Sequence, residues 1–215
     1  VWPMDGKNIL ILGGTGDAIS IAEKLFLIGN YKIITSLAGV TQKPRLPIGK
    51  AHIGGCGGRE GLINFLEANQ INLIVDATHP FSTQIKENAI FASNELSVPI
   101  IHFVRDQWKM EIGDKWHMVD NLPEASNKLR ELSSTRKLKV FLTVGRKGLA
   151  DFADILNSKF VIRSIEKPSA LEGFSRAEWI EGRGPFSFDN ELKLLQQEQI
   201  DIIVTKNSGG LSGKA

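Results

Sequence analysis

Residues 8–18 of the chain read NILILGGTGDA, and this stretch decides the fold. Its apolar first half is typical of a parallel strand that is buried on both faces, and the glycines end that strand abruptly. Apolar residues then recur at helical spacing over residues 17–28, and a second apolar run follows at 32–35. Together these segments predict a strand–helix–strand unit of about thirty residues, the length that a right-handed crossover requires.

The same alternation continues along the chain. In the first half we expect further strands at residues 52–53, 73–76 and 100–104, with helices at 60–69 and 83–96. In the second half we expect helices at 123–132 and 188–197, a short helix between the first two strands, and strands at 140–143, 160–165 and 202–205. The sequence therefore predicts an α/β fold with two Rossmann-like domains built on mainly parallel sheets.

The domain boundary is expected near residue 105, before the irregular segment 106–120. We assign residues 4–105 to a first Rossmann-like domain and residues 106–215 to a second, smaller α/β domain. No helix follows the last predicted strand, so we expect this second domain to be incomplete at its C-terminus.

The overall composition excludes several classes of protein. Hydrophobic residues make up 42% of the chain, which suits a packed globular protein. Positive and negative side chains nearly balance, with a formal net charge of +2, whereas a protein that follows a nucleic-acid backbone would have a clear excess of positive charge. Cys56 is the single cysteine, so no intramolecular disulfide can form, and no apolar stretch has the length of a signal peptide or a membrane span. We therefore expect a cytoplasmic protein that binds neither nucleic acid nor a membrane; its oligomeric state is left open.

The glycine-rich turn Gly13-Gly14-Thr15-Gly16-Asp17-Ala18 has the residue types of a phosphate-binding loop. Small residues let the phosphates of a ligand approach the helix N-terminus, where unpaired N–H groups attract an anion. Relative to the dinucleotide fingerprint G-x-G-x-x-G/A, Thr15 stands at the second glycine position and Ala18 is an allowed residue at the third. We predict that all six residues bind the cofactor. The alternative is a tight strand-to-helix turn without a ligand.

The end of the second predicted strand bears on the choice between NADPH and NADH. An NAD-type site has an acidic residue there for the ribose hydroxyls, but this strand ends in Thr35-Ser36 with no carboxylate nearby. The site thus tolerates a 2′-phosphate, to which Ser36 could donate while Lys43 or Arg45 neutralises its charge, although all three could equally be surface residues. We expect NADPH, with NADH as the alternative, and count Ser36 and the adjacent Leu37 among the cofactor-binding residues.

A second polar segment, residues 76–81, reads DATHPF and follows a buried strand. Ligands of such sheets lie beyond the carboxyl ends of the strands, which places Thr78 and His79 near nicotinamide or substrate. We predict that Thr78 binds the cofactor and that His79 is the catalytic proton-transfer residue; the alternative for His79 is a hydrogen-bonded turn before Pro80. The other histidines have no mutual spacing suited to a metal, so no metal site is expected.

Cations follow three strands of the second half. Glycine beside arginine or lysine suits the capture of a carboxylate or phosphate, because backbone N–H groups add to the charge of the side chain. The predicted substrate-binding residues are Arg146, Arg163, Arg183, Lys206, Asn207 and Ser208. One such cation alone is more often a solvated surface charge, but the group predicts a polyanionic substrate.

In order and spacing, several segments resemble the precorrin-6A reductase family of cobalamin biosynthesis. The most specific are DATHPF at 76–81 and TKNSGG at 205–210, and the others are 11–18, 36–39, 54–58, 143–146 and 183–186. The resemblance implies a two-domain Rossmann-like reductase that transfers hydride from a nicotinamide cofactor to a double bond of the precorrin-6A macrocycle, giving precorrin-6B. It also implies that the basic residues of the second half bind the acetate and propionate groups of this tetrapyrrole. The proton donor stays open between His79, a water and a substrate carboxyl.

The sequence departs from the family pattern at two places. Val40 stands where members often have an arginine, which weakens the case for NADPH, and the helix and strand that usually follow the segment 205–210 are absent from this sequence. The alternatives are an NADH-dependent cobalt-precorrin-6A reductase of the anaerobic branch and a non-enzymatic NADP-binding sensor. A short-chain dehydrogenase is disfavoured because the sole tyrosine, Tyr31, directly precedes Lys32 instead of standing four residues before a lysine.

Overall fold

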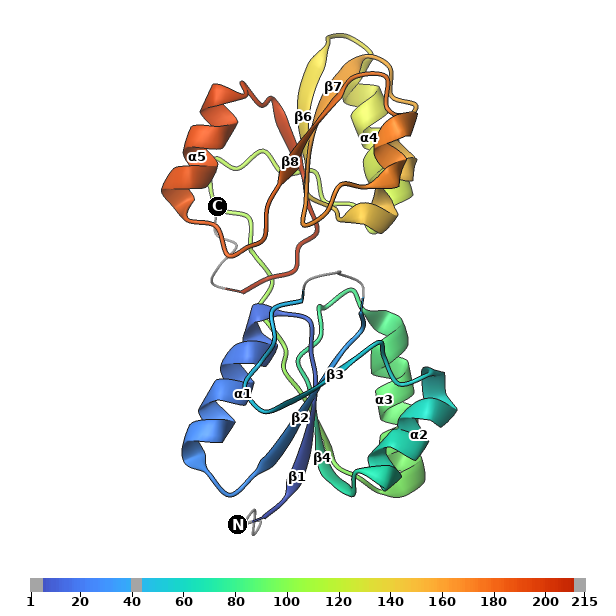
Figure 1. Cartoon of the computed structure of the whole chain (residues 1–215). Helices are drawn as coiled ribbons and strands as arrows, with labels where there is room; N and C mark the ends of the chain where they lie inside the picture. The colour runs from blue at the N-terminus through green and yellow to red at the C-terminus, as the bar shows by residue number, and fades with distance from the viewer. Residues whose placement is uncertain (1–5, 40–43, 211–215) are drawn as a thin grey trace. The chain divides into compact units, whose positions relative to one another are not determined.

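The computed structural model describes residues 6–39 and 44–210, so the predictions about Val40 and Lys43 lie outside the described residues. The chain divides into two compact units, Val1–Arg105 and Asp106–Ala215 (Figure 1). Each unit has its own parallel sheet, which confirms the predicted α/β fold class. Below, they are called the N-terminal unit and the C-terminal unit.

The N-terminal unit is a five-stranded parallel sheet in the order β3-β2-β1-β4-β5. Along the chain its elements are β1 (Asn8–Leu12), α1 (Gly16–Ile28), β2 (Lys32–Leu37), β3 (Lys50–Ile53), α2 (Gly58–Ala68), β4 (Ile71–Asp76), α3 (Thr83–Leu96) and β5 (Ile100–His102). The strand order reverses direction between β1 and β4, which makes this pair the topological switch point, the place where open α/β sheets bind ligands. The strand β5 ends at His102 rather than at Val104 as predicted, and Val104 is exposed.

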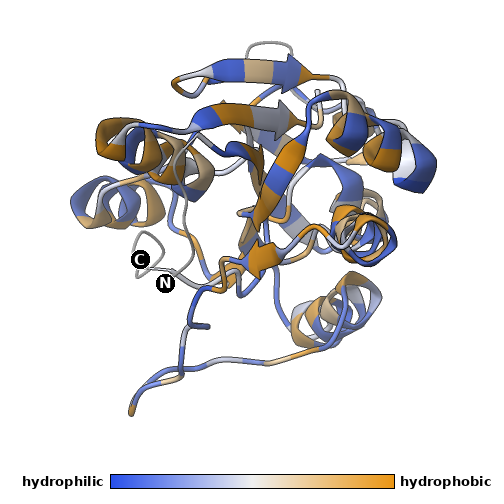
Figure 2. Ribbon diagram, turned by 90° about the horizontal axis from the view of Figure 1, so that it is seen from below, coloured by the Kyte–Doolittle hydropathy of each residue, from blue (hydrophilic) through white to orange (hydrophobic). Residues whose placement is uncertain are grey.

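Helices cover both faces of this sheet. On one face, Ile9 and Ile11 of β1 pack with Ala18 and Ala22 of α1. On the other face, Leu10 and Leu12 pack with residues of α2 and α3. The apolar run of β1 is 0–1% exposed from Ile9 to Leu12, which explains why it has no alternating pattern. Figure 2 shows that the helices carry hydrophobic and hydrophilic residues side by side, as helices that pack on a sheet with one face do.

The C-terminal unit is a four-stranded parallel sheet in the order β8-β7-β6-β9. Along the chain its elements are α4 (Leu122–Ser133), β6 (Leu138–Leu142), the 3₁₀ turns η1 (Arg146–Gly148) and η2 (Ala150–Phe152), β7 (Ser158–Ser164), η3 (Ser169–Gly173), β8 (Ala177–Glu181), α5 (Phe188–Gln197) and β9 (Ile202–Val204). The predicted elements omit β8. None of its residues is fully buried, and Glu178 and Glu181 stand on either side of Trp179 and Ile180, so this edge strand lacks the apolar run that marks the other strands of its sheet.

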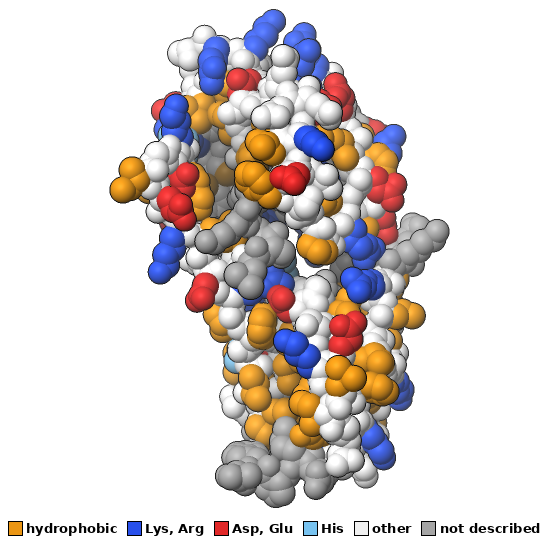
Figure 3. Space-filling view, turned by 90° about the vertical axis from the view of Figure 1, so that its left-hand side faces the viewer, with side chains coloured by type: hydrophobic (Ala, Val, Ile, Leu, Met, Phe, Trp, Pro, Cys, Tyr) orange, Lys and Arg blue, Asp and Glu red, His pale blue; other side chains and the backbone are white. Residues whose placement is uncertain are grey.

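The two faces of the C-terminal sheet are covered unequally. One face packs Val140, Leu142 and Ile162 against Leu129 of α4 and Phe152 of η2. The helix α5, by contrast, contains no buried residue among those described. The N-terminal unit also exposes apolar side chains, since Phe26, Leu27 and Ile28 at the end of α1 are 53%, 83% and 68% exposed. Figure 3 shows hydrophobic side chains gathered over the lower, N-terminal unit.

Candidate functional site

The glycine loop between β1 and α1 is shaped by Thr15, which caps the helix. Thr15 Oγ1 accepts a hydrogen bond from Ala18 N at 3.2 Å and donates one to the carbonyl of Ala77 at 2.7 Å. One helix amide is thereby satisfied, and the loop is bonded to the turn that follows β4. Among the described residues, the amides of Gly16 and Asp17 have no acceptor, so they are the donors that remain at the N-terminus of α1.

The glycines of this loop are required for different reasons. A Cβ on Gly13 would lie 2.9 Å from the Thr35 methyl group on the neighbouring strand, so Gly13 permits close packing. Gly14 has a φ of 104°, which other residues rarely adopt. A Cβ on Gly16 would meet no atom within 4 Å, so the space in front of the helix N-terminus is open to a ligand. Such a cradle with unused amides fits the pyrophosphate of a dinucleotide.

Asp17 brings a negative charge to the same place, and an arginine neutralises it. Asp17 Oδ2 accepts a hydrogen bond from Nε of Arg105 at 2.6 Å, and Nη2 of the same guanidinium lies 2.5 Å from it in an ion pair. The positive end of the helix macrodipole stabilises this carboxylate, but the carboxylate would repel a pyrophosphate bound at the same place. The bonded guanidinium offsets this repulsion, so Arg105, which follows β5, is a residue of the site that sequence reasoning missed.

At the end of β2, Ser36 and Leu37 are buried, at 7% and 6% exposed. Ser36 Oγ lies 3.6 Å from Cys56 Sγ, and burial raises the pKa of the Cys56 thiol. The Ser36 carbonyl accepts from Gly13 N at 2.9 Å and so attaches β2 to the glycine loop. Arg45 is exposed, and no acidic residue occurs from Thr35 to Arg45 in the sequence.

Beyond β4, Asp76 is a fully buried carboxylate with several donors. Its Oδ1 accepts from Thr78 N at 3.1 Å and from Thr78 Oγ1 at 2.6 Å, while its Oδ2 accepts from Lys86 Nζ and His102 Nδ1, each at 2.9 Å. Burial by itself raises the pKa of Asp76, but the hydrogen bonds outweigh it and lower the pKa to about 2. The carboxylate is therefore ionised and joins β4, α3 and β5 at the carboxyl edge of the sheet.

His79, the predicted proton-transfer residue, lies in the turn that follows Thr78. Its Nδ1 accepts from Phe81 N at 3.3 Å, and its carbonyl accepts from Ser82 N at 2.9 Å. The side chain is partly exposed. The turn that was the alternative for His79 is thus present, and a neutral ring that accepts at Nδ1 carries its proton on Nε2.

In the C-terminal unit, two of the predicted substrate-binding cations follow the strands of a second switch point, between β6 and β9. Arg146 comes after β6, and its guanidinium donates a hydrogen bond to the Glu166 carboxylate at 3.0 Å. Lys206 lies two residues beyond the end of β9. Arg183 follows β8 at the edge of the sheet and precedes a cis bond between Gly184 and Pro185.

Arg163 lies on β7 and is held by other side chains of the unit. Its guanidinium makes two hydrogen bonds to the Glu191 carboxylate, at 2.5 and 2.7 Å, and stacks 3.6 Å from the centre of the Phe186 ring. The ion pair is largely buried, with 11% and 13% of the two side chains exposed. These contacts join β7, α5 and the loop that contains Arg183.

Asn207 and Ser208 follow Lys206 in the same segment. The Asn207 side chain forms a reciprocal pair of hydrogen bonds with the backbone of Trp108, accepting at Oδ1 from Trp108 N and donating from Nδ2 to its carbonyl, each at 2.9 Å. Trp108 Nε1 also donates to the Gly210 carbonyl at 3.1 Å. Ser208 N donates to the Lys206 carbonyl at 2.7 Å. This segment is thus fixed to residues 106–108 of the same unit.

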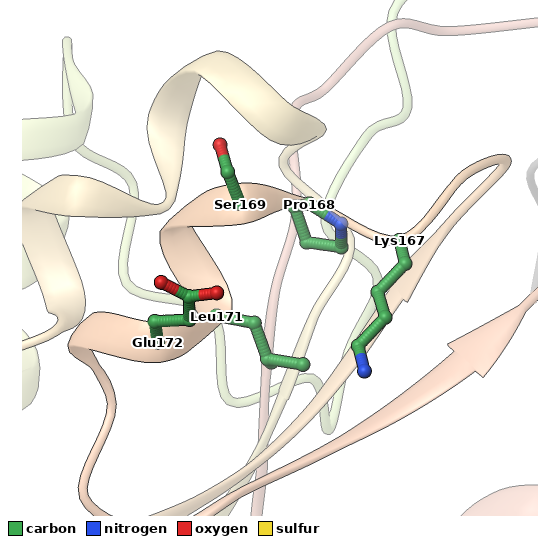
Figure 4. Close-up of a pocket in the computed structure, with 5 residues that line it drawn as sticks. All are labelled: Lys167, Pro168, Ser169, Leu171 and Glu172. Carbon is green, nitrogen blue, oxygen red and sulfur yellow. The ribbon is translucent and has the colours of Figure 1, made fainter.

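An open pocket lies where β7 gives way to η3 (Figure 4). It is lined by Lys167, Pro168, Ser169, Leu171 and Glu172. None of the predicted substrate-binding residues lines it. Across the described ranges, no group of three or more His, Cys, Asp or Glu side chains could hold a metal ion, and no helix there is long and apolar enough to cross a membrane.

The chain is similar to known proteins over nearly its whole length. The family model described as "Precorrin-6x reductase CbiJ/CobK" matches residues 8–215. A precorrin-6A reductase of Rhodococcus erythropolis is 40% identical over 203 residues, covering 94% of this chain and 80% of that protein. One of Mycobacterium tuberculosis is 38% identical over 208 residues, covering 97% and 82%.

A solved structure described as "CobK precorrin-6A reductase" superposes with a TM-score of 0.91 at 32% identity, covering 97% of this chain and 81% of that one. The family model spans both units, and the identity to curated members extends over nearly the whole chain. The chain therefore belongs to the precorrin-6x reductase family, CbiJ/CobK.

Proposed function

We propose that this chain is a precorrin-6A reductase that transfers hydride from NADPH to a double bond of the precorrin-6A macrocycle and yields precorrin-6B. The observation that carries the proposal is the 40% identity to a precorrin-6A reductase across 94% of the chain. The open cradle at Gly16, next to two amides without acceptors, supports dinucleotide binding at the switch point of the N-terminal unit.

The preference for NADPH rests on the end of β2. A ribose with free hydroxyls would call for a carboxylate there, and the sequence has none from Thr35 to Arg45. Ser36 and Leu37 are buried beside this strand end, so in this proposal they shape the adenosine side of the site. We place the reaction in the cytoplasm, because the single cysteine permits no intramolecular disulfide.

The reduced nicotinamide supplies the hydride when the cofactor is bound. The amides of Gly16 and Asp17 hold the pyrophosphate, and Thr78 binds the nicotinamide half beyond β4. Arg146, Arg183 and Lys206 pair with acetate and propionate groups of the macrocycle, which fixes its orientation. His79 donates the proton that completes the reduction, through the Nε2–H that its contact with Phe81 N implies.

The test is anaerobic mixing of the protein with precorrin-6A and each reduced nicotinamide in turn. We expect NADPH oxidation in step with a change in the macrocycle spectrum, and slower oxidation of NADH. A protein that binds NADPH and oxidises none of it with precorrin-6A present would be a sensor rather than a reductase. Turnover only with the cobalt-containing macrocycle would assign the chain to the other branch of the pathway.

A further inference from the structure

The carboxylate of Asp76 has no assigned part in the reaction, yet its bonds determine what Thr78 can do. Asp76 is 0% exposed, and its oxygens accept from Thr78, Lys86 and His102, which come from three different elements. Burying a charge is tolerated only when donors surround it in this way. Such a network fixes the positions of its members more firmly than a single hydrogen bond would.

The direction of the bond between Asp76 and Thr78 follows from the charge of Asp76. The two oxygens are 2.6 Å apart, and only one of the two groups has a proton to give. The pKa of Asp76 is lowered to about 2 by its hydrogen-bond donors, so the carboxylate is ionised at neutral pH and can only accept. The Thr78 hydroxyl is therefore the donor. Since a hydroxyl has one proton, Thr78 Oγ1 is left with lone pairs and nothing further to donate.

Thr78 stands at the switch point of the N-terminal unit. It follows the end of β4 by two residues, and β4 is paired directly with β1. The neighbouring Ala77 carbonyl accepts from Thr15 of the glycine loop, and Ala77 N donates to the Leu12 carbonyl. The turn that holds Thr78 and the loop proposed to bind the pyrophosphate are thus one bonded assembly. A dinucleotide seated on that loop has its nicotinamide half within this region of the sheet edge.

Resting on the proposed function, we propose that Asp76 is a positioning residue that makes Thr78 Oγ1 an obligate hydrogen-bond acceptor for an N–H or O–H donor of the nicotinamide half. Two groups of that half have this chemistry, the carboxamide NH₂ and the hydroxyls of the attached ribose. An analogue that lacks the donor leaves the Thr78 lone pairs without a partner, and a lost hydrogen bond of this kind weakens binding about tenfold.

The experiment measures dissociation constants by calorimetry for NADP⁺ and two analogues. One analogue has an acetyl group in place of the carboxamide and so lacks the N–H donors, and the other lacks a nicotinamide-ribose hydroxyl. We expect the wild type to bind one analogue about tenfold more weakly than NADP⁺. Thr78→Val should bring that ratio to about one, because valine has no acceptor, whereas Thr78→Ser should retain it.

The matched control is Thr83→Val, the same substitution at an exposed position at the start of α3. It should show the wild-type ratio. Asp76→Asn tests the positioning role. The amide of asparagine can donate to Thr78 Oγ1, and the Thr78 hydroxyl is then able to donate its own proton to another partner. We expect this variant to lose the discrimination between the analogue and NADP⁺. Retained discrimination in a folded Asp76→Asn would overturn the positioning role of Asp76. If this variant does not fold, the Thr78 series still tests whether Thr78 Oγ1 accepts from the cofactor, because it leaves the Asp76 carboxylate in place.

Equal ratios in the wild type and Thr78→Val for both analogues would overturn the proposal. So would a wild type that binds no dinucleotide, which would overturn the proposed function as well. Discrimination in binding without any reduction of precorrin-6A would support the role of Thr78 while removing the proposed function. Because affinity ratios and turnover are measured separately, the two failures are distinguishable.

Discussion

The four strands of the C-terminal sheet have the same order as four of the five strands of the N-terminal sheet, but the two switch points carry different groups. In the N-terminal unit the order β3-β2-β1-β4 places β1 beside β4, and in the C-terminal unit β8-β7-β6-β9 places β6 beside β9. The first switch point presents backbone amides and a buried carboxylate with all its donors in place. The second presents long cationic side chains, of which Arg146 is paired with Glu166.

This difference suggests two kinds of recognition. Backbone amides cannot move far, so the N-terminal edge suits a ligand of constant shape such as a pyrophosphate. The ion pair between Arg146 and Glu166 is only partly buried, with 37% and 25% of the two side chains exposed. Solvent weakens such a pair, so we expect Arg146 to exchange Glu166 for a substrate carboxylate at small cost. The comparison can be tested at positions that differ in burial and in partners.

The largest effect is expected for Arg163, a predicted substrate-binding cation that is held in a largely buried pair. Arg163→Ala leaves Glu191 without its partner, and breaking such a pair costs about 3–5 kcal/mol of unfolding free energy. Urea denaturation of the variant checks this, with Arg176→Ala, an exposed arginine of the same unit, as control. Unchanged stability together with weaker precorrin binding would show that Arg163 contacts substrate, as the sequence suggested.

Blocking the cradle of the N-terminal unit should come next. Gly16→Val puts a side chain into space that is empty of protein atoms, so the fold should persist while NADPH binding weakens by about 100-fold, or about 3 kcal/mol. Gly16→Ala should give a smaller loss. Fluorescence titration of NADPH measures both, and affinity equal to wild type in Gly16→Val would place the cofactor elsewhere.

The buried carboxylate makes the N-terminal unit sensitive to acid. The pKa of Asp76 is about 2 in the fold against a model value of 3.8, so ionised Asp76 contributes about 2 kcal/mol of stability above pH 4. Because the folded pKa is the lower one, this contribution is lost as the pH falls from about 4 to about 2. The gap in unfolding free energy between wild type and Asp76→Asn should narrow over that range. A gap that is constant with pH would contradict the assignment.

Removing cations at the second switch point should affect the substrate and spare the cofactor. Arg146→Ala and Lys206→Ala are each expected to raise KM for precorrin-6A about tenfold, or about 1.4 kcal/mol, with NADPH affinity unchanged. Arg183→Ala, at the sheet edge, should have a smaller effect. If Arg183 matters most, the comparison with the N-terminal switch point fails.

The smallest effect is expected at Thr15, where a glycine would match the dinucleotide fingerprint. The variant tests whether this match raises or lowers the stability of the fold. Thr15→Gly restores the second glycine but removes the cap on Ala18 N and the bond to the Ala77 carbonyl, so we expect a loss of about 1 kcal/mol in unfolding free energy. Thr15→Ser keeps both bonds and should resemble the wild type. Thermal unfolding compares the two variants, and a stabilised Thr15→Gly would refute this role of the hydroxyl.

The fold was largely predictable because buried strands and glycine breaks are local signals. The run at Asn8–Leu12 and the glycines after it determine the first crossover without information from elsewhere in the chain. The strand β8 was missed because its residues are half-exposed, and β5 was extended too far because Phe103 and Val104 continue its apolar pattern beyond the sheet.

The site was predictable as a set of strand ends but not as a set of contacts. Sequence placed Thr78 beyond β4, yet the other partners of Asp76, Lys86 and His102, belong to elements that only tertiary packing brings to this carboxylate. The carboxylate directly after the apolar run at residues 73–75 was the available signal. Likewise, nothing local marks Arg163 as the partner of Glu191, or Asn207 as the partner of Trp108.

The single thiol of the chain has a practical consequence. Cys56 is half-buried beside Ser36, and its raised pKa leaves little thiolate at neutral pH. A maleimide should therefore react slowly with the folded protein and quickly once the strands around β2 separate. Because each chain has a single cysteine, the fraction of alkylated protein in mass spectra at successive times would give the rate at which the N-terminal unit opens locally around Cys56.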